Sequence, residues 1–201
     1  RPFDQGRLSG LLEGLEAAVV RASDLPDDLR CDSQYFRKGY LVEDQALQRQ
    51  RLTTIGACAF VTDGPHGYHE VDEEAPTAML TARSAGNWFA ERESAETVAE
   101  WVVNSNRRSL LAVGDVILST RGTVGSCAIV TDEALPAIID QDVARIAFDP
   151  DQGLISTYVL AYLNCRFGQD HIARNASGMV QQGMSLAKVR NIPVPKLSAG
   201  F

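Results

Sequence analysis

The sequence predicts an α+β domain built on a twisted, mostly antiparallel, half-barrel-like sheet with a few flanking helices. From residue 51 onward, short β-rich runs bounded by Gly, Pro or Asp recur along the chain. Single helical patterns interrupt these runs in irregular order, without the regular alternation that indicates a parallel sheet. A length of 201 residues, with 45% hydrophobic and 22% charged residues, fits one globular domain with a short N-terminal extension.

The first 82 residues contain an N-terminal segment and two predicted strands. A weakly amphipathic stretch covers residues 8–20, and after a polar break a short aromatic piece follows over 34–41. The next segments are rich in β-branched and apolar residues and end at turn-forming residues. We therefore predict strands over 52–62 and 77–82.

A helix is predicted after these strands. Ser94 is typical of a helix N-terminus, and the apolar residues after it share one helical face as far as Arg108. Trp101 lies on that face. Because periodic aromatic residues are mostly structural, we expect Trp101 and Trp88 to pack in the core or against a helix.

The middle of the chain gives the clearest strand pattern. Residues 116–119 and 127–130 are two apolar runs joined by a Gly-containing connection, which predicts an antiparallel hairpin. Residues 143–148 alternate apolar and polar side chains before a turn, and we predict a third strand there.

The last quarter predicts helices and an extended end. Residues 155–163 repeat apolar side chains at four-residue spacing, as a buried helix face does, and Gly168 is expected to separate this helix from a second one that reaches Arg174. Ser185 can cap a short helix over 185–190. The prolines in 192–195 require an extended backbone.

Common catalytic motifs are absent from the sequence. It has no GxGxxG, GxxxxGK[ST], GxSxG or HExxH pattern. A metal-dependent hydrolase centred on His66 and His69, with Asp63 as a third ligand, stays an alternative, although metal ligands usually come in fuller sets. If no metal binds, this loop offers its imidazoles and the Tyr68 ring to a partner for hydrogen bonds or stacking. Asp140 and Asp142 have no companion lysine of a nuclease centre and are predicted to be polar residues ahead of a strand.

Composition limits the cellular setting. No apolar run approaches the roughly 18 residues that cross a bilayer. The four cysteines lie far apart with no CxxC pair, which favours reduced thiols in a cytoplasmic protein.

The charge distribution points to one basic region. The net charge is −7, which opposes loose binding to phosphates and leaves an acidic protein-protein adaptor as a second alternative. Residues 151–201, however, carry five Lys and Arg against two Asp. Gln181 and Gln182 lie there and can pair with adenine in a major groove. Earlier in the chain, the glycines after Arg121 allow main-chain N–H groups to approach a phosphate closely. The Arg121 side chain can bind a phosphate or read guanine.

Taken in order, several segments resemble the target recognition domain of type I restriction-modification specificity subunits. The resemblance covers roughly residues 30–196 and its order and spacing make chance agreement improbable. The segments are CDSQYF over 31–36, FVTDGPH over 60–66, GDVILSTRGTVG over 114–125, YLN over 162–164, SGMVQ over 177–181, and Ser185-Leu186 leading to IPVP over 192–195.

The resemblance implies a non-catalytic module that recognises a short sequence of double-stranded DNA. Its partners would be an adenine DNA methyltransferase subunit and, in restriction complexes, an endonuclease subunit. S-adenosylmethionine, ATP and Mg²⁺ would belong to those partners, so no cofactor is expected here. Residues 1–30 would be an extension or linker, 31–197 the recognition domain and 198–201 the start of a spacer. A chain acting as half a specificity subunit could form a homodimer.

The DNA-binding residues are predicted in two groups. The first lies in the hairpin connection and the late loop, and the second lies in two earlier loops. These residues are Arg121, Thr123, Gln181, Gln182, Ser185 and Lys188, followed by His66, Tyr68 and Arg83. An acidic chain can bind DNA in this way only if its cations share a face, so we expect the following to gather while the acids of 72–74 and 91–100 point elsewhere: Arg83, Arg107, Arg108, Arg121, Lys188 and Arg190.

Overall fold

The computed structural model describes most of the chain. The described residues are 5–16, 18–26, 30–67, 69–86, 88–93, 95–149, 155–176 and 183–196. The chain divides into two compact units, Arg1–Gln50 and Arg51–Phe201. No described helix is long and apolar enough to span a bilayer.

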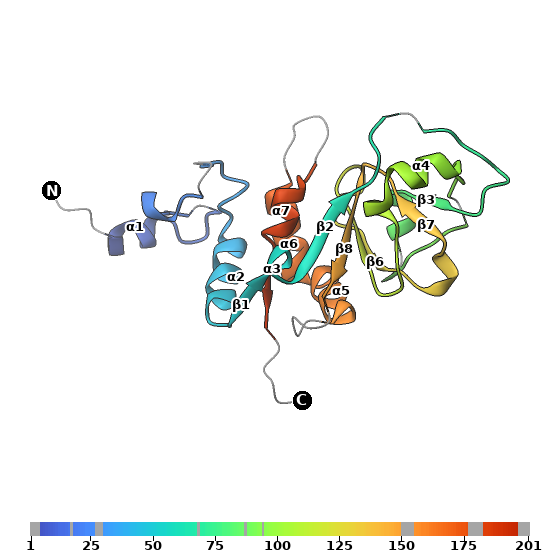
Figure 1. The fold of residues 1–201 in the computed structure, drawn as a ribbon. Coiled ribbons are helices and arrows are strands. Elements are labelled where there is room, and N and C mark those ends of the chain that lie inside the picture. The colour runs from blue at the N-terminus through green and yellow to red at the C-terminus, as the bar shows by residue number, and fades with distance from the viewer. Residues whose placement is uncertain are drawn as a thin grey trace. The chain divides into compact units, whose positions relative to one another are not determined.

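The helices and strands follow one another in irregular order, as Figure 1 shows. The α-helices are α1 (Gln5–Leu11), α2 (Lys38–Gln48), α3 (Ile55–Cys58), α4 (Glu100–Ser105), α5 (Ser156–Asn164), α6 (Arg166–Asn175) and α7 (Leu186–Arg190). The 3-10 turns are η1 (Ala22–Asp24), η2 (Ala82–Ala85), η3 (Arg107–Ser109) and η4 (Asp132–Ala134). The strands are β1 (Leu52–Thr54), β2 (Ala59–Asp63), β3 (Ala78–Leu80), β4 (Trp88–Phe89), β5 (Val116–Ser119), β6 (Cys127–Ile129), β7 (Ala137–Ile139), β8 (Val143–Phe148) and β9 (Pro193–Pro195).

The smaller unit is helical. Within it, the Lys38 ammonium at the start of α2 donates to the carbonyls of Leu12 and Leu15. The Arg30 guanidinium lies 4.9 Å from the centroid of the Tyr35 ring. The helix α2 begins within the aromatic piece over 34–41, at Lys38, and the sequence pattern did not indicate it.

The larger unit confirms the predicted α+β class with a mostly antiparallel sheet. Five strands are ordered β2-β8-β5-β6-β4, and β2 and β4 are the edges of this open sheet among the described residues. The pairs β2–β8, β8–β5 and β5–β6 are antiparallel, whereas β4 joins β6 in parallel. Two small sheets accompany it, an antiparallel β1–β9 pair and a parallel β3–β7 pair. The predicted hairpin, the strand over 143–148 and the extended end are therefore confirmed.

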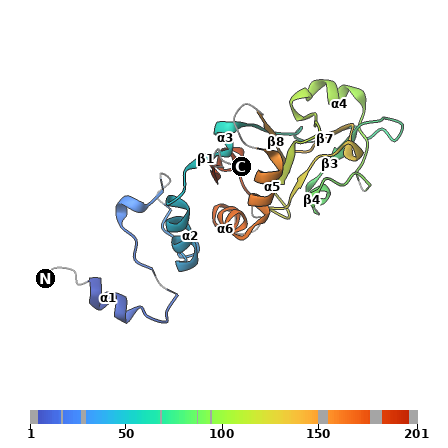
Figure 2. The same cartoon turned by 90° about the horizontal axis from the view of Figure 1, so that it is seen from below.

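The core lies on both faces of the β3–β7 pair. On one face, Leu80 and Ile139 pack against Ile117 of β5 and Val143 of β8, and all four side chains are fully buried. On the other face, Met79 and its neighbours pack against α4 and the residues before it. Figure 2 shows α4 on one side of these strands and the α5–α6 pair on the other.

Several predicted element boundaries are wrong because contacts with distant parts of the chain override the local sequence pattern. The predicted strand over 52–62 is interrupted by α3, where Ile55 N–H donates to Ile192 O at 3.1 Å. The predicted helix over 94–108 is shorter, because residues 97 and 98 form bridges with Ala78 and Val71 and only α4 remains helical. The break between α5 and α6 falls at Cys165 rather than Gly168.

Both tryptophans depart from their predicted packing role. Trp88 is 53% exposed and Trp101 is 55% exposed. Trp101 donates its indole N–H to Glu70 Oε2 at 2.8 Å, and Trp88 adopts a positive φ of 48° in the edge strand β4. Neither ring therefore belongs to the core.

Candidate nucleic-acid interface

Three strands bring loops together at one end of the five-stranded sheet. Asp63 ends β2 opposite Ala144, and Ser119 ends β5 opposite Val143, the first residue of β8. The segments that follow β2, follow β5 and precede β8 therefore meet here. We call this region the loop end of the sheet.

The turn before β8 links the loop end through its main chain. Gly64 N–H donates to Asp140 O at 3.0 Å, and Asp140 N–H donates to Leu80 O, also at 3.0 Å. On the other side, Thr120 donates to Asp142 O through its N–H at 2.8 Å and its hydroxyl at 3.0 Å. Asp140 and Asp142 thus lie in a turn directly ahead of a strand, which confirms their predicted place.

Arg121 lies at the loop end, in the connection that follows β5. Its main chain forms an isolated antiparallel bridge with Gly183, and Met184 N–H donates to Thr120 O at 2.9 Å. Its guanidinium lies 3.2 Å from Asp142 Oδ1. The structure therefore brings together the hairpin connection and the start of the late segment, two of the regions predicted to bind DNA. Thr123 follows in the same connection and is exposed.

Asp63 holds two further side chains at the loop end. His66 Nε2 lies 2.9 Å from Asp63 Oδ2, and the Arg108 guanidinium lies 3.3 Å from Asp63 Oδ1. Both His66 and Arg108 are more than half exposed. The pairing of Arg108 with Asp63 was not indicated by the sequence, because the two residues lie far apart along the chain.

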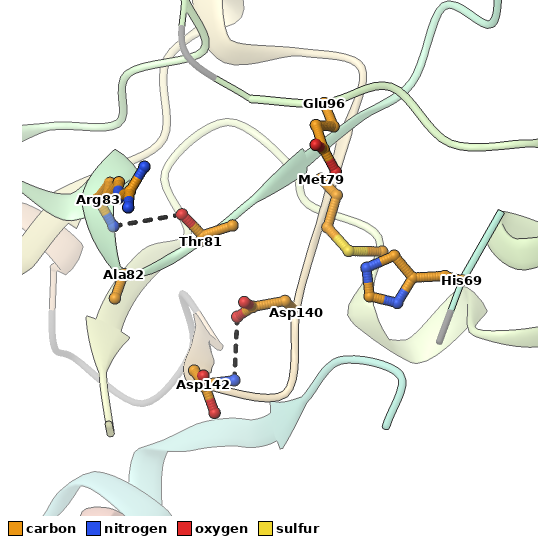
Figure 3. A pocket seen from close by; sticks show the side chains of 8 residues that line it. All are labelled: His69, Met79, Thr81, Ala82, Arg83, Glu96, Asp140 and Asp142. Atoms are coloured by element: carbon orange, nitrogen blue, oxygen red, sulfur yellow. Dashed lines mark hydrogen bonds between the residues drawn. The ribbon is translucent and has the colours of Figure 1, made fainter. Parts of the chain in front are cut away.

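A hollow of about 380 Å³ adjoins this region (Figure 3). Arg83 and His69 lie on opposite sides of it in Figure 3, and the Asp140 carboxylate points into the space between them. The Arg83 side chain is exposed and has no hydrogen-bond acceptor among the described residues, and His69 Nδ1 is buried without a partner there. The lining residues are His69, Met79, Thr81, Ala82, Arg83, Glu96, Asp140 and Asp142.

Burial in this hollow changes the acidity of Asp140. Desolvation raises the pKa of its carboxyl group to about 6, and the nearby negative charge of Asp142 acts in the same direction. A hydrogen bond from Asp142 N–H to Asp140 Oδ1, 2.9 Å long, partly offsets this rise. Asp140 therefore loses its proton at a higher pH than an exposed aspartate does.

The late segment has a more structural role than the sequence suggested. The Ser185 hydroxyl accepts from Lys188 N–H at 3.4 Å and caps α7, as predicted. The Lys188 ammonium donates to Asn175 O at 2.8 Å, and the Arg190 guanidinium donates to Val61 O at 2.7 Å. These two cations are thus directed to main-chain carbonyls. Tyr68, Gln181 and Gln182 lie outside the described residues.

The expected segregation of charge is only partly correct. Arg83, Arg108 and Arg121 belong to the loop end or its hollow, as expected. Glu96 lies in the same hollow, although the acids of 91–100 were expected to point elsewhere. The reason is that Glu96 O accepts from Met79 N–H at 2.8 Å, which fixes this segment beside β3.

The histidine loop does not assemble a metal-ligand cluster. His66 pairs with Asp63, whereas His69 lines the hollow. Within the described ranges no group of three or more His, Cys, Asp or Glu side chains could hold a metal ion. The hydrolase alternative therefore lacks a geometric basis in this part of the chain.

Comparison with solved structures finds similar folds in proteins of restriction-modification systems. No family model and no curated protein sequence matches the chain. A chain of a type I R-M system matches with a TM-score of 0.55 and 16% identity, over 80% of this chain and 42% of that one. The HsdS subunit from Thermoanaerobacter tengcongensis matches with a TM-score of 0.50 and 15% identity, over 78% and 38%. The type IIG restriction endonuclease BpuSI matches with a TM-score of 0.51 and 7% identity, over 85% and 27%.

These matches confirm the predicted resemblance at the level of the fold. The matched part of the chain, about four fifths of it, has the fold found in type I specificity subunits. The present chain spans less than half the length of each of the three proteins.

Proposed function

We propose that this chain is a sequence-specific recognition module for double-stranded DNA in a restriction-modification system of type I. One observation carries the proposal: in a fold shared with type I specificity subunits, Arg121 and its bridge partner Gly183 join two predicted DNA-binding segments at one end of the sheet. Loops that converge at one end of a rigid sheet are suited to reading base edges in a groove.

In this proposal the chain performs no catalysis. Cations position the module on phosphates, while polar loop side chains read bases. The methyl transfer, and in host defence the cleavage, would belong to an adenine methyltransferase subunit and an endonuclease subunit with their own cofactors. The acidic net charge of −7 implies weak binding by the isolated chain, to which contacts made by a partner would add.

Selection from a duplex library tests the proposal. The full chain is incubated at low ionic strength with 30-base-pair duplexes whose centre is randomised, and bound duplexes are sequenced over successive rounds. We expect one short motif to be enriched, with an affinity that falls steeply as salt rises. Binding without any sequence preference, or no binding at micromolar protein, would contradict the proposal.

The alternatives predict different results. An acidic adaptor would compete with DNA for a DNA-binding enzyme while showing no affinity for the duplex itself. A metal-dependent hydrolase would retain a stoichiometric transition metal through purification, which elemental analysis of the full chain detects.

A further inference from the structure

The Arg121–Asp142 pair presents hydrogen-bond donors and an acceptor side by side at the loop end. Arg121 Nη1 lies 3.2 Å from Asp142 Oδ1, and the two side chains are 47% and 36% exposed. A guanidinium has five N–H donors, so Arg121 retains donors beyond the one directed at Asp142. Ionised Asp142 likewise retains acceptor positions.

The main chain fixes both residues of the pair. The Ser119 hydroxyl donates to Arg121 O at 2.7 Å, and Arg121 N–H donates to Asp142 O at 3.3 Å. Asp142 is held from the other side by its N–H bond to Asp140 Oδ1. Groups held in this way lose little conformational freedom when they bind, which favours a specific contact.

This arrangement is complementary to one base pair. In the major groove a G·C pair presents two acceptors, guanine N7 and O6, followed by the donor N4–H₂ of cytosine. An Arg–carboxylate pair presents two donors followed by an acceptor. The O6 and N4 atoms are joined by a hydrogen bond of about 2.9 Å, close to ordinary N–H···O length. The Arg121–Asp142 separation of 3.2 Å therefore matches the spacing of the atoms to be read.

We propose that Arg121 and Asp142 together read one G·C base pair of the target, with Arg121 donating to guanine and Asp142 accepting from cytosine N4. The inference rests on the proposed function and adds Asp142 as a residue that determines specificity. The sequence prediction had placed Arg121 in the interface and given Asp142 no such role.

Other partners fit the pair less well. A phosphate would be repelled by the Asp142 carboxylate, which neutralises the charge of Arg121. An A·T pair presents an acceptor, a donor, an acceptor and a methyl group, so the second Arg donor would face the adenine amino group. Arg83, whose guanidinium has no acceptor among the described residues, is better suited to a phosphate.

The test repeats the duplex selection with two variants of the full chain, Asp142→Ala and Arg121→Ala, which remove the acceptor and the donors of the pair. Each is expected to lose about tenfold in discrimination at one G·C position of the wild-type motif and to keep the rest of the motif. Asp132→Ala is the matched control, because Asp132 is exposed in η4, which follows β6 at the opposite end of the sheet. It removes the same charge and should leave the motif unchanged.

Modified bases locate the contact at atomic level. With 7-deazaguanine at that position, affinity should fall about tenfold for the wild type and little for Arg121→Ala. With N4-methylcytosine, affinity should fall about tenfold for the wild type and little for Asp142→Ala. If a motif is enriched but contains no G·C pair that responds to either variant, the inference is wrong and the proposed function stands. If the wild type enriches no motif, the proposed function fails, and the inference fails with it.

Discussion

Arg121 and Gly183 form an isolated antiparallel bridge, so the turn after β5 and the segment before α7 are held together by main-chain contacts. Met184 N–H, which donates to Thr120 O, extends this connection by one residue. Ser185 comes next and caps α7. The position of the late segment at the loop end therefore depends on both the bridge and the cap.

The first prediction separates the two roles of Ser185. Ser185→Ala removes the acceptor for Lys188 N–H and should lower the free energy of unfolding by about 1 kcal/mol, whereas Ser185→Asp keeps an acceptor and should stay near the wild type. Urea denaturation measures both. DNA affinity should fall in Ser185→Asp, because its added charge repels phosphates. If Ser185→Asp lowers the free energy of unfolding as much as Ser185→Ala does, the loss does not come from the side-chain acceptor that caps α7.

The second prediction concerns Arg83 as a phosphate contact. Arg83→Ala should weaken duplex binding equally across sequences and reduce the slope of log K against log salt by about 1, because one cation is lost. Stability should not change, since the guanidinium has no acceptor among the described residues.

Arg92→Ala is the matched control for Arg83. The Arg92 guanidinium donates to the carbonyls of Pro76 and Pro136, so its loss should lower stability and leave the salt slope nearly unchanged. Fluorescence anisotropy titrations at several salt concentrations measure the slopes. The same slope for Arg83→Ala and the wild type would remove Arg83 from the interface.

The third prediction tests the packing beneath the loop end. A Cβ on Gly64 would lie 1.8 Å from Ile139 O, whereas one on Gly86 would lie 3.6 Å from Arg83 O. Gly64→Ala must therefore displace the turn before β8, and we expect a loss of about 2 kcal/mol or more in the free energy of unfolding. Gly86→Ala, with an αR backbone, should change it by less than about 0.5 kcal/mol. Similar denaturation midpoints for both variants would contradict this account.

The sequence was most informative where local pattern and tertiary structure agree. The alternation over 143–148 and the Ser185 cap involve interactions within a strand or a turn, and both are confirmed. The parallel pairs β3–β7 and β4–β6 were missed because each joins strands far apart in the chain and each strand is only two or three residues long. Strands of this length carry little periodicity to detect.

The candidate site shows the same division. Arg121 could be recognised because a cation beside flexible glycines is a local pattern. Its partner Asp142 and the Asp63–Arg108 pair depend on the register of β2, β5 and β8, which a single sequence does not reveal. Lys188 and Arg190 appeared available as cations, and only the structure showed their main-chain acceptors.

The fourth prediction is that ionisation of Asp140 destabilises the fold. Burial raises the pKa of its carboxyl group from 3.8 to about 6, so the folded state holds this proton more tightly than the unfolded state. The stabilisation that the protonated Asp140 carboxyl group provides is therefore complete below about pH 4. It is lost as the pH rises through about 6. Partial exposure screens the effect, and we expect about 2 kcal/mol or less.

Asp140→Asn tests this linkage because the amide oxygen can still accept from Asp142 N–H while carrying no charge. The variant should match the wild type in stability near pH 4 and exceed it above pH 6. Denaturation midpoints at half-unit pH intervals give the difference between the two curves, and Asp132→Asn, an exposed residue, should run parallel to the wild type. A constant difference between Asp140→Asn and the wild type across this range would show that the carboxyl group titrates at its ordinary pKa. A difference that opens between pH 4 and 6 would instead show that the loop end keeps Asp140 charged at neutral pH at a cost in stability, as expected of a surface shaped for binding rather than for rigidity.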